Sequence, residues 1–224
     1  MPVMNKIKLL CCLFLFLGLS SLSAQITVGL QVQSGESWQY YGEETAINGF
    51  DQRIPHYGVS AQVYYPVLPH LAIGLSPGFM RRGAACFPGF TGGFQPVQDA
   101  TIYANYLQLP VMLKADFPLG GRWFTYAEGG AGFSYLLNGH WDLLFANLEG
   151  DRQRRDIDFE EDSFLNRFDF AVQANLGVAY QLGVGQLRLG AGYYHGLLDV
   201  NDNNTSENRA WSINLAYHYS LGNN

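Results

Sequence analysis

Cysteine is scarce in this chain of 224 residues, and so are charged side chains and long apolar runs. Two of the three cysteines, Cys11 and Cys12, lie in an apolar N-terminal segment, so the rest of the chain keeps only Cys86. A single cysteine excludes a module held together by internal disulfides. After residue 25 no window holds about 18 consecutive apolar residues, which excludes a transmembrane helix.

The N-terminal segment has the layout of a secretory signal peptide. Lys6 and Lys8 form a short basic region at the start of an apolar run, Ile7–Leu19, and a stretch of small residues follows this run. We expect cleavage after Ala24 or Ser23, so that residues 1–24 leave the exported protein.

The remaining residues, 25–224, have a length that fits one domain. Without Lys6 and Lys8, 11 basic residues stand against 19 acidic ones, a formal charge of −8, which argues against nucleic acid as a partner. Aromatic residues make up 15% of the chain and charged residues only 14%, an unusual balance for a soluble surface. A β-rich soluble domain with a large core remains the alternative at this point.

Alternation of apolar and polar residues with a period of two recurs along the chain, whereas a sustained helical period does not. In the clearest segment Phe170, Val172 and Leu176 alternate with Asp169 and Gln173. Eight segments of this kind are predicted as strands, at 25–33, 57–65, 71–79, 104–118, 122–137, 168–182, 187–197 and 210–221.

The connections between these segments alternate between short and long. Short turns fall near 67–70, 118–121 and 183–186, and long polar segments cover 34–56, 83–101, 138–166 and 199–209. This alternation is typical of an outer-membrane barrel with tight periplasmic turns and long extracellular loops. It also places both termini of the domain on the periplasmic side.

A soluble barrel of the lipocalin type alternates as well, with its two faces exchanged. Three features favour the membrane: a polar face too hydrophilic for a dry core, strands of about ten residues that suit a tilted crossing, and aromatic residues at strand ends. The aromatic residues expected to form interfacial girdles are Tyr64, Tyr65, Phe117, Trp123, Tyr180, Trp211, Tyr217 and Tyr219. The predicted fold is therefore all-β, an eight-stranded antiparallel up-and-down transmembrane β-barrel, with outer-membrane lipids around it.

The same alternation assigns polar and charged side chains to the barrel interior. They are Gln108, Lys114, Asp116, Glu128, Asp169, Gln173 and Arg188. Antiparallel pairing around the turn at 118–121 brings Lys114 near Glu128, which suggests an internal ion pair. These side chains could line a gate or narrow polar conduit, but eight strands leave room only for side chains, which favours a hydrogen-bonded plug.

The stretch 105–118, NYLQLPVMLKADFP, resembles a strand of porin-family outer-membrane β-barrel domains of the PorT type, with their Asn/Tyr-Leu-Glu-Ile-Pro-Leu-Leu-Lys pattern. Segments that agree in order are 57–67, 71–80, 167–182, 188–200 and 209–219. The resemblance implies an eight-stranded barrel similar to those of OmpA and OmpX, inserted by the barrel-insertion machinery, and most of the family has no defined activity. Such barrels commonly end on an aromatic residue, whereas this chain continues past Tyr219.

A lipid-modifying enzyme would need a nucleophile and a base together near the outer rim. Ser134 and His195 lie at that level, but alternation directs Ser134 inward and His195 outward. His140 with Asp142 lacks a nucleophile, and Cys86 lacks a base. We therefore predict no catalytic residues and no enzymatic activity.

The charge-dense segment 149–162 matches no known calcium loop, so we predict a solvated loop and neither a metal nor a cofactor. Pro66, Pro77 and Pro110 should weaken their strands or mark bulges. The predicted function is a structural or surface-binding role in the cell outer membrane. The alternatives are a narrow small-solute channel and, after that, a lipid-modifying enzyme.

Overall fold

The computed structural model of the protein describes residues 25–41, 52–86, 97–145, 152–158, 166–200 and 206–221. The predicted signal peptide lies outside these residues. The described chain forms β1 (Thr27–Tyr41), β2 (Ile54–Leu68), β3 (Leu71–Leu75), β4 (Gly78–Cys86), β5 (Val97–Gly120), β6 (Trp123–Phe145), β7 (Arg152–Asp156), β8 (Phe168–Leu182), β9 (Gly185–Asp199) and β10 (Ser206–Ser220).

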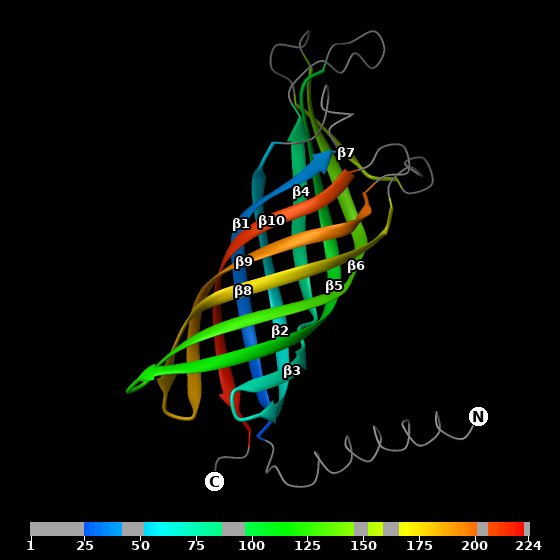
Figure 1. Cartoon of the computed structure of the whole chain (residues 1–224). Helices are drawn as coiled ribbons and strands as arrows, with labels where there is room; N and C mark the ends of the chain where they lie inside the picture. The colour runs from blue at the N-terminus through cyan, green and yellow to red at the C-terminus, as the bar shows by residue number, and fades with distance from the viewer. Residues whose placement is uncertain are drawn as a thin grey trace, which may run out of the picture.

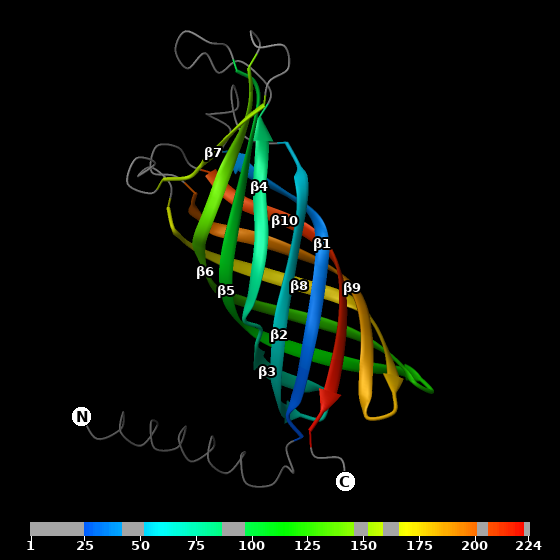
Figure 2. The same cartoon turned by 180° about the vertical axis from the view of Figure 1, so that it is seen from behind.

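These strands form one antiparallel sheet that closes on itself, because β1 pairs with both β2 and β10 and the opposite side is joined by the pairing of β5 with β6 (Figure 1). β3 and β4 follow one another between the same neighbours, β2 and β5, and together make one spanning strand. β7 pairs with β6 outside the ring. The prediction of an eight-stranded antiparallel barrel is confirmed, and the view from behind in Figure 2 shows β1 between β2 and β10.

The two faces of the sheet differ as a membrane barrel requires. On β5, Leu107 and Leu113 are 53% and 51% exposed on the outer face, whereas Gln108 and Lys114 are each only 6% exposed. Outward apolar side chains continue around all spanning strands, and we call them the apolar belt. On β5 the apolar belt runs from Leu107 to Leu119. Thirteen residues of strand tilted at about 45° cover a hydrocarbon layer of roughly 30 Å.

Pro110 lies opposite a break in its neighbouring strand, at Ser76–Pro77 between β3 and β4. Its carbonyl oxygen accepts a hydrogen bond of 3.1 Å from the backbone N–H of Ser76. In an extended strand the nitrogen of a residue faces the same side as its carbonyl, so the missing N–H of Pro110 falls at this break and costs the β6 ladder nothing. The prediction of one continuous strand over 71–79 is wrong here.

Several strands extend into segments that the sequence predicts as long connections, so these connections are shorter than predicted. β1 continues to Tyr41, β4 to Cys86 and β6 to Phe145, and β7 adds a strand within the predicted loop 138–166. These extensions pass beyond the apolar belt, where the outer face carries residues such as Glu36 and the apolar–polar alternation disappears. Strand pairing there is maintained by the backbone ladder, together with buried apolar residues on the inner face such as Ala84 and Ile102.

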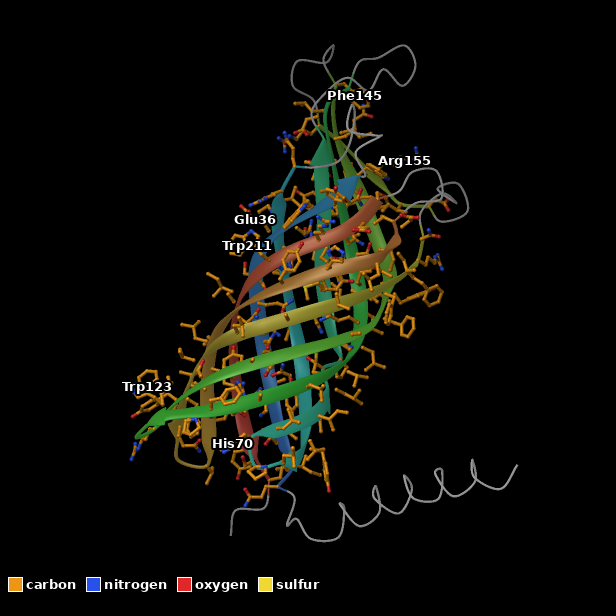
Figure 3. All side chains as sticks on the ribbon, in the orientation of Figure 1. Glu36, His70, Trp123, Phe145, Arg155 and Trp211 are labelled. Carbon is orange, nitrogen blue, oxygen red and sulfur yellow. The ribbon has the colours of Figure 1, made fainter. Side chains whose placement is uncertain are left out.

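The barrel has two distinct ends. Short turns join β2 to β3, β5 to β6 and β8 to β9 at one end, where β1 begins and β10 ends, and we call this the short-turn end. In Figure 3 His70 and Trp123 lie toward it, whereas Phe145 and Arg155 lie at the opposite end, the long-connection end. The described residues contain no helix with the length and apolar character that a membrane span requires.

Candidate functional site

Two buried ion-pair clusters occupy the barrel interior, and the one nearer the short-turn end is built around Arg188 of β9. One terminal nitrogen of its guanidinium (Nη2) lies 3.1 Å from Asp116 Oδ1 and 3.3 Å from Glu128 Oε1. Lys114 Nζ lies 3.4 Å from the other oxygen of Asp116. We call these four residues the Arg188 cluster. Two cations thus face two carboxylates, so the cluster is balanced in charge, as buried ions require.

Lys114 and Glu128 are direct cross-strand partners, as the pairing of β5 with β6 predicted. The suggested ion pair between them does not form, because Lys114 pairs with Asp116 and Glu128 pairs with Arg188. Lys114 Nζ also lies 4.7 Å from the ring centroid of Tyr64. A planar guanidinium reaching across the lumen satisfies both carboxylates better than a single ammonium does.

Polar and aromatic side chains fill the space around the Arg188 cluster. The guanidinium of Arg188 lies over the ring of Tyr126, 3.9 Å from its centroid, and its second terminal nitrogen donates to His218 Nδ1 at 3.3 Å. That bond leaves His218 Nε2 to donate to Gln62 Oε1 at 2.6 Å. The cluster is therefore held from β2, β5, β6, β9 and β10.

The second cluster lies nearer the long-connection end and is built around Arg82 of β4. Arg82 Nη1 lies 3.7 Å from Asp169 Oδ2, and its guanidinium is 3.6 Å from the ring centroid of Tyr194. Asp169 Oδ2 also accepts hydrogen bonds from Tyr194 at 2.8 Å and from Asn208 at 3.1 Å. The second terminal nitrogen (Nη2) of Arg82 donates to Gln108 and Ser134. We call Arg82, Asp169 and Tyr194 the Arg82 cluster.

Amide and thioether side chains lie between the two clusters. Asn214 donates to Asn175 at 2.9 Å, and Asn175 donates to Glu128 at 3.4 Å. Gln173, predicted to face the interior, donates to the sulfur of Met112 at 3.1 Å. A cavity of about 20 Å³ and another of about 10 Å³ border these residues. Such volumes hold about one water molecule each at most, far less than a passage for solutes.

An apolar cluster lies beyond the Arg82 cluster, toward the long-connection end. It consists of the buried residues Ala84, Ile102, Ile157 and Val200, with Trp141 packed against them. Trp141 points toward this cluster because β6 has a β-bulge at Leu137. On β5, Asn105 and Tyr106 are consecutive, but their partners on β6 are Asn138 and Leu136. A bulge of this kind exchanges the two faces of a strand from that point on. We call these five residues the apolar cap.

The predicted girdle residues lie on the outer face, with one exception. Phe117 and Trp123 are about half exposed at the short-turn end, and Trp123 packs edge-on against Tyr180 with ring centroids 4.9 Å apart. Trp211 lies toward the long-connection end, beside Glu36 (Figure 3). The prediction is wrong for Tyr64, which is 1% exposed and faces the interior. Tyr65, Tyr217 and Tyr219 line the outer face.

The residues considered for catalysis do not form a catalytic arrangement. Ser134 is buried and bonded to Arg82 and Tyr194, whereas His195 lies on the outer face with Glu207, 3.6 Å away. His140 and Asp142 belong to β6 rather than to a loop, and the nearest nitrogen–oxygen distance of their ion pair is 4.0 Å.

The predicted solvated segment 149–162 is described only for residues 152–158, and the rest of it lies outside the described residues. β7 covers most of this part, and its five side chains are all exposed. Within the described ranges no three His, Cys, Asp or Glu side chains gather closely enough to hold a metal ion.

Sequence reasoning missed Arg82, Tyr194 and His218, which hold the clusters together. The signal was present, because even-numbered positions 72, 74, 76 and 78 of the predicted third strand point inward, and Arg82 continues the series. The predicted strand stopped at residue 79, so Arg82 fell just beyond it.

A closed antiparallel barrel with an apolar outer belt and a polar, ion-paired interior defines a transmembrane β-barrel. The model of the family described as outer membrane protein beta-barrel domain matches residues 19–202, more than half of the chain. The chain belongs to this family and is an outer-membrane protein. A comparison with curated proteins gives no significant match.

Solved outer-membrane barrels are similar over most of the chain. OprG from Pseudomonas aeruginosa is 11% identical with a TM-score of 0.49, and the match covers 89% of this chain and 97% of OprG. Neisserial surface protein A is 12% identical with a TM-score of 0.43, covering 84% and 95%. The attachment invasion locus protein Ail of Yersinia pestis is 12% identical with a TM-score of 0.42, covering 87% and 99%.

Proposed function

We propose that the protein is a closed, non-catalytic outer-membrane barrel that holds a binding surface outside the cell. The observation that carries this proposal is the filled lumen. The Arg188 cluster, the Arg82 cluster and the apolar cap follow one another along the barrel axis, each built from several strands. Among the described residues, an interior packed in this way stabilises the barrel and opposes the passage of a solute.

The proposed surface is the sheet formed by the ends of β5, β6 and β7 that extend beyond the apolar belt. In this part β6 pairs with β5 on one side and with β7 on the other, for example Trp141 with Ile102 and with Arg155. The apolar cap underlies it and fixes its position on the barrel. Binding surfaces are commonly built from such extensions on a rigid scaffold.

We further propose that this surface is extracellular, that the short-turn end is periplasmic, and that residues 1–24 direct export. The short–long order of the connections supports this orientation. To test it, Cys86 is replaced by serine, and a cysteine is introduced by Arg155→Cys or, as the matched control, by His70→Cys. A membrane-impermeant maleimide should label Arg155→Cys in intact cells and His70→Cys only after the outer membrane is permeabilised. Labelling of His70→Cys in intact cells would reverse the proposed orientation.

Conductance in planar bilayers tests the closed lumen. The wild-type protein, verified as folded by its heat-dependent gel mobility, should give no single-channel steps. Glu128→Gln removes one carboxylate of the Arg188 cluster, and Glu207→Gln is the control on the outer face. Single-channel steps in the wild type, altered by Glu128→Gln but not by Glu207→Gln, would contradict the closed barrel and indicate a channel.

A further inference from the structure

Two consecutive arginines on β4 face opposite sides of the barrel wall. Arg82 points into the lumen and is 1% exposed, whereas Arg81 points outward and is partly exposed. The partners of Arg82 are the buried groups described above. The surroundings of Arg81 are different and consist of aromatic rings and amides.

Arg81 has no carboxylate within ion-pair distance among the residues that the structure describes. Two other outward arginines near the same end are paired with carboxylates: Arg53 Nη1 lies 3.5 Å from Glu36, and Arg209 Nη2 lies 3.1 Å from Glu207. In the described part of the chain, the single hydrogen bond of the Arg81 guanidinium goes from Nη1 to the hydroxyl of Tyr57, at 3.1 Å. The remaining N–H groups of its planar fork are available to an external anion.

Two tyrosine rings hold the guanidinium in place. Arg81 Cζ lies 4.2 Å from the ring centroid of Tyr103 and 5.7 Å from that of Tyr57. Tyr103 in turn stacks on His140, with ring centroids 5.0 Å apart. A side chain fixed in this way loses less conformational freedom when it binds a ligand.

Arg81 lies at the first polar row beyond the apolar belt. Its cross-strand partners are Tyr57 on β2 and Asn105 on β5. The next outward positions toward the short-turn end are Val59 and Leu107, which are 48% and 53% exposed. In the same row Asn105 donates to Asn138 at 2.6 Å. The cation therefore lies where lipid headgroups meet the hydrocarbon layer.

We propose that Arg81, Tyr57 and Tyr103 form a binding site for the phosphate of a lipid headgroup, with the lipid's acyl chains lying on Val59 and Leu107. A guanidinium fork matches a phosphate in two parallel hydrogen bonds, which a carboxylate-free arginine at this level can make. The apolar belt directly beneath adds acyl contacts that a soluble phosphate does not have. The leaflet follows from the orientation proposed above, but binding itself does not depend on it.

The test uses the folded protein in a maltoside detergent, which contains no phosphate. Dioleoyl phosphatidic acid is titrated, and the bound lipid is measured by native mass spectrometry, with dioleoylglycerol as the probe that lacks the phosphate. The wild type should retain phosphatidic acid and not dioleoylglycerol. Arg81→Gln should weaken retention at least about tenfold, the loss expected for a charged hydrogen-bonding partner. Arg81→Lys should fall between the two, because it keeps the charge and loses the fork.

Two arginines provide matched controls. Arg53→Gln removes a carboxylate-paired arginine near the same end, and Arg122→Gln removes an exposed arginine in the turn at the short-turn end. Both variants should retain phosphatidic acid as the wild type does, and gel mobility verifies that each variant is folded. Equal retention by Arg81→Gln, equal retention of dioleoylglycerol, or displacement of the lipid by millimolar inorganic phosphate would each overturn the proposal.

Discussion

Replacement of Asp169 by asparagine tests whether the Arg82 cluster stabilises the barrel. The substitution preserves the shape of the side chain but leaves the guanidinium of Arg82, 1% exposed, without its carboxylate. Removing one partner of a buried ion pair costs about 3–5 kcal/mol. Arg82 keeps its hydrogen bonds to Gln108 and Ser134 and its contact with the Tyr194 ring. We therefore expect a loss near the lower value, about 3 kcal/mol.

The loss is measured by urea unfolding of the protein in lipid vesicles, followed by tryptophan fluorescence and by gel mobility. Glu207→Gln is the control, because its ion pairs lie on the outer face with side chains 22–29% exposed, where solvent weakens them, so their loss should cost about 1 kcal/mol. The double variant Arg82→Met with Asp169→Leu removes both charges and should be more stable than Asp169→Asn. An Asp169→Asn protein as stable as the wild type would refute the assignment of a stabilising role to this pair.

Two further predictions concern the wall of the barrel. Leu113→Arg, at the middle of the apolar belt on β5, should reduce the unfolding free energy by about 2–4 kcal/mol, whereas Leu119→Arg at its edge should cost about 0–1 kcal/mol; equal effects in urea unfolding would contradict the position of the belt. Gly132→Ala should cost about 1–3 kcal/mol in the same assay, because its new Cβ would collide with Pro110. A Cβ at Gly129 would come no nearer than 4.0 Å to the backbone oxygen of Gln173, so Gly129→Ala should be close to neutral. A neutral Gly132→Ala would show that β5 and β6 are not so closely packed there.

The sequence predicts the barrel well because each spanning strand must satisfy two environments at once. In one alternating stretch, Leu107 and Leu113 face lipid, whereas Gln108 and Lys114 face the lumen. The alternation therefore predicts the side chains of both faces of the strand. The strand ends beyond the apolar belt could not be predicted in the same way. There both faces meet water or protein, and residues such as Glu36 carry no periodic signal.

The partners inside the lumen could be predicted only in part. Local pairing brings Lys114 beside Glu128, but Arg188 comes from β9, and only the tilt and register of the whole barrel determine which residues meet across the lumen. Tyr64 shows the opposite error. It alternates with Gln62 on the inward face, yet its aromatic character and position near a strand end suggested the interface. For Tyr64 the alternation of the strand predicts the direction of the side chain correctly, whereas its aromatic character does not.

The pairing of β1 with β10 has a consequence for how the barrel forms. Thr27 lies beside Ser220, so the contact that closes the ring joins residues from opposite ends of the domain. Contacts between such distant residues require the largest loss of chain entropy and are slow to form. Until β10 arrives, β1 and β9 each present an open edge of unpaired backbone groups, which a hydrocarbon layer does not tolerate. Closure should therefore be the late, cooperative step of assembly. A chain truncated before residue 206 would lack β10 and would lose both the β1–β10 and the β9–β10 ladders.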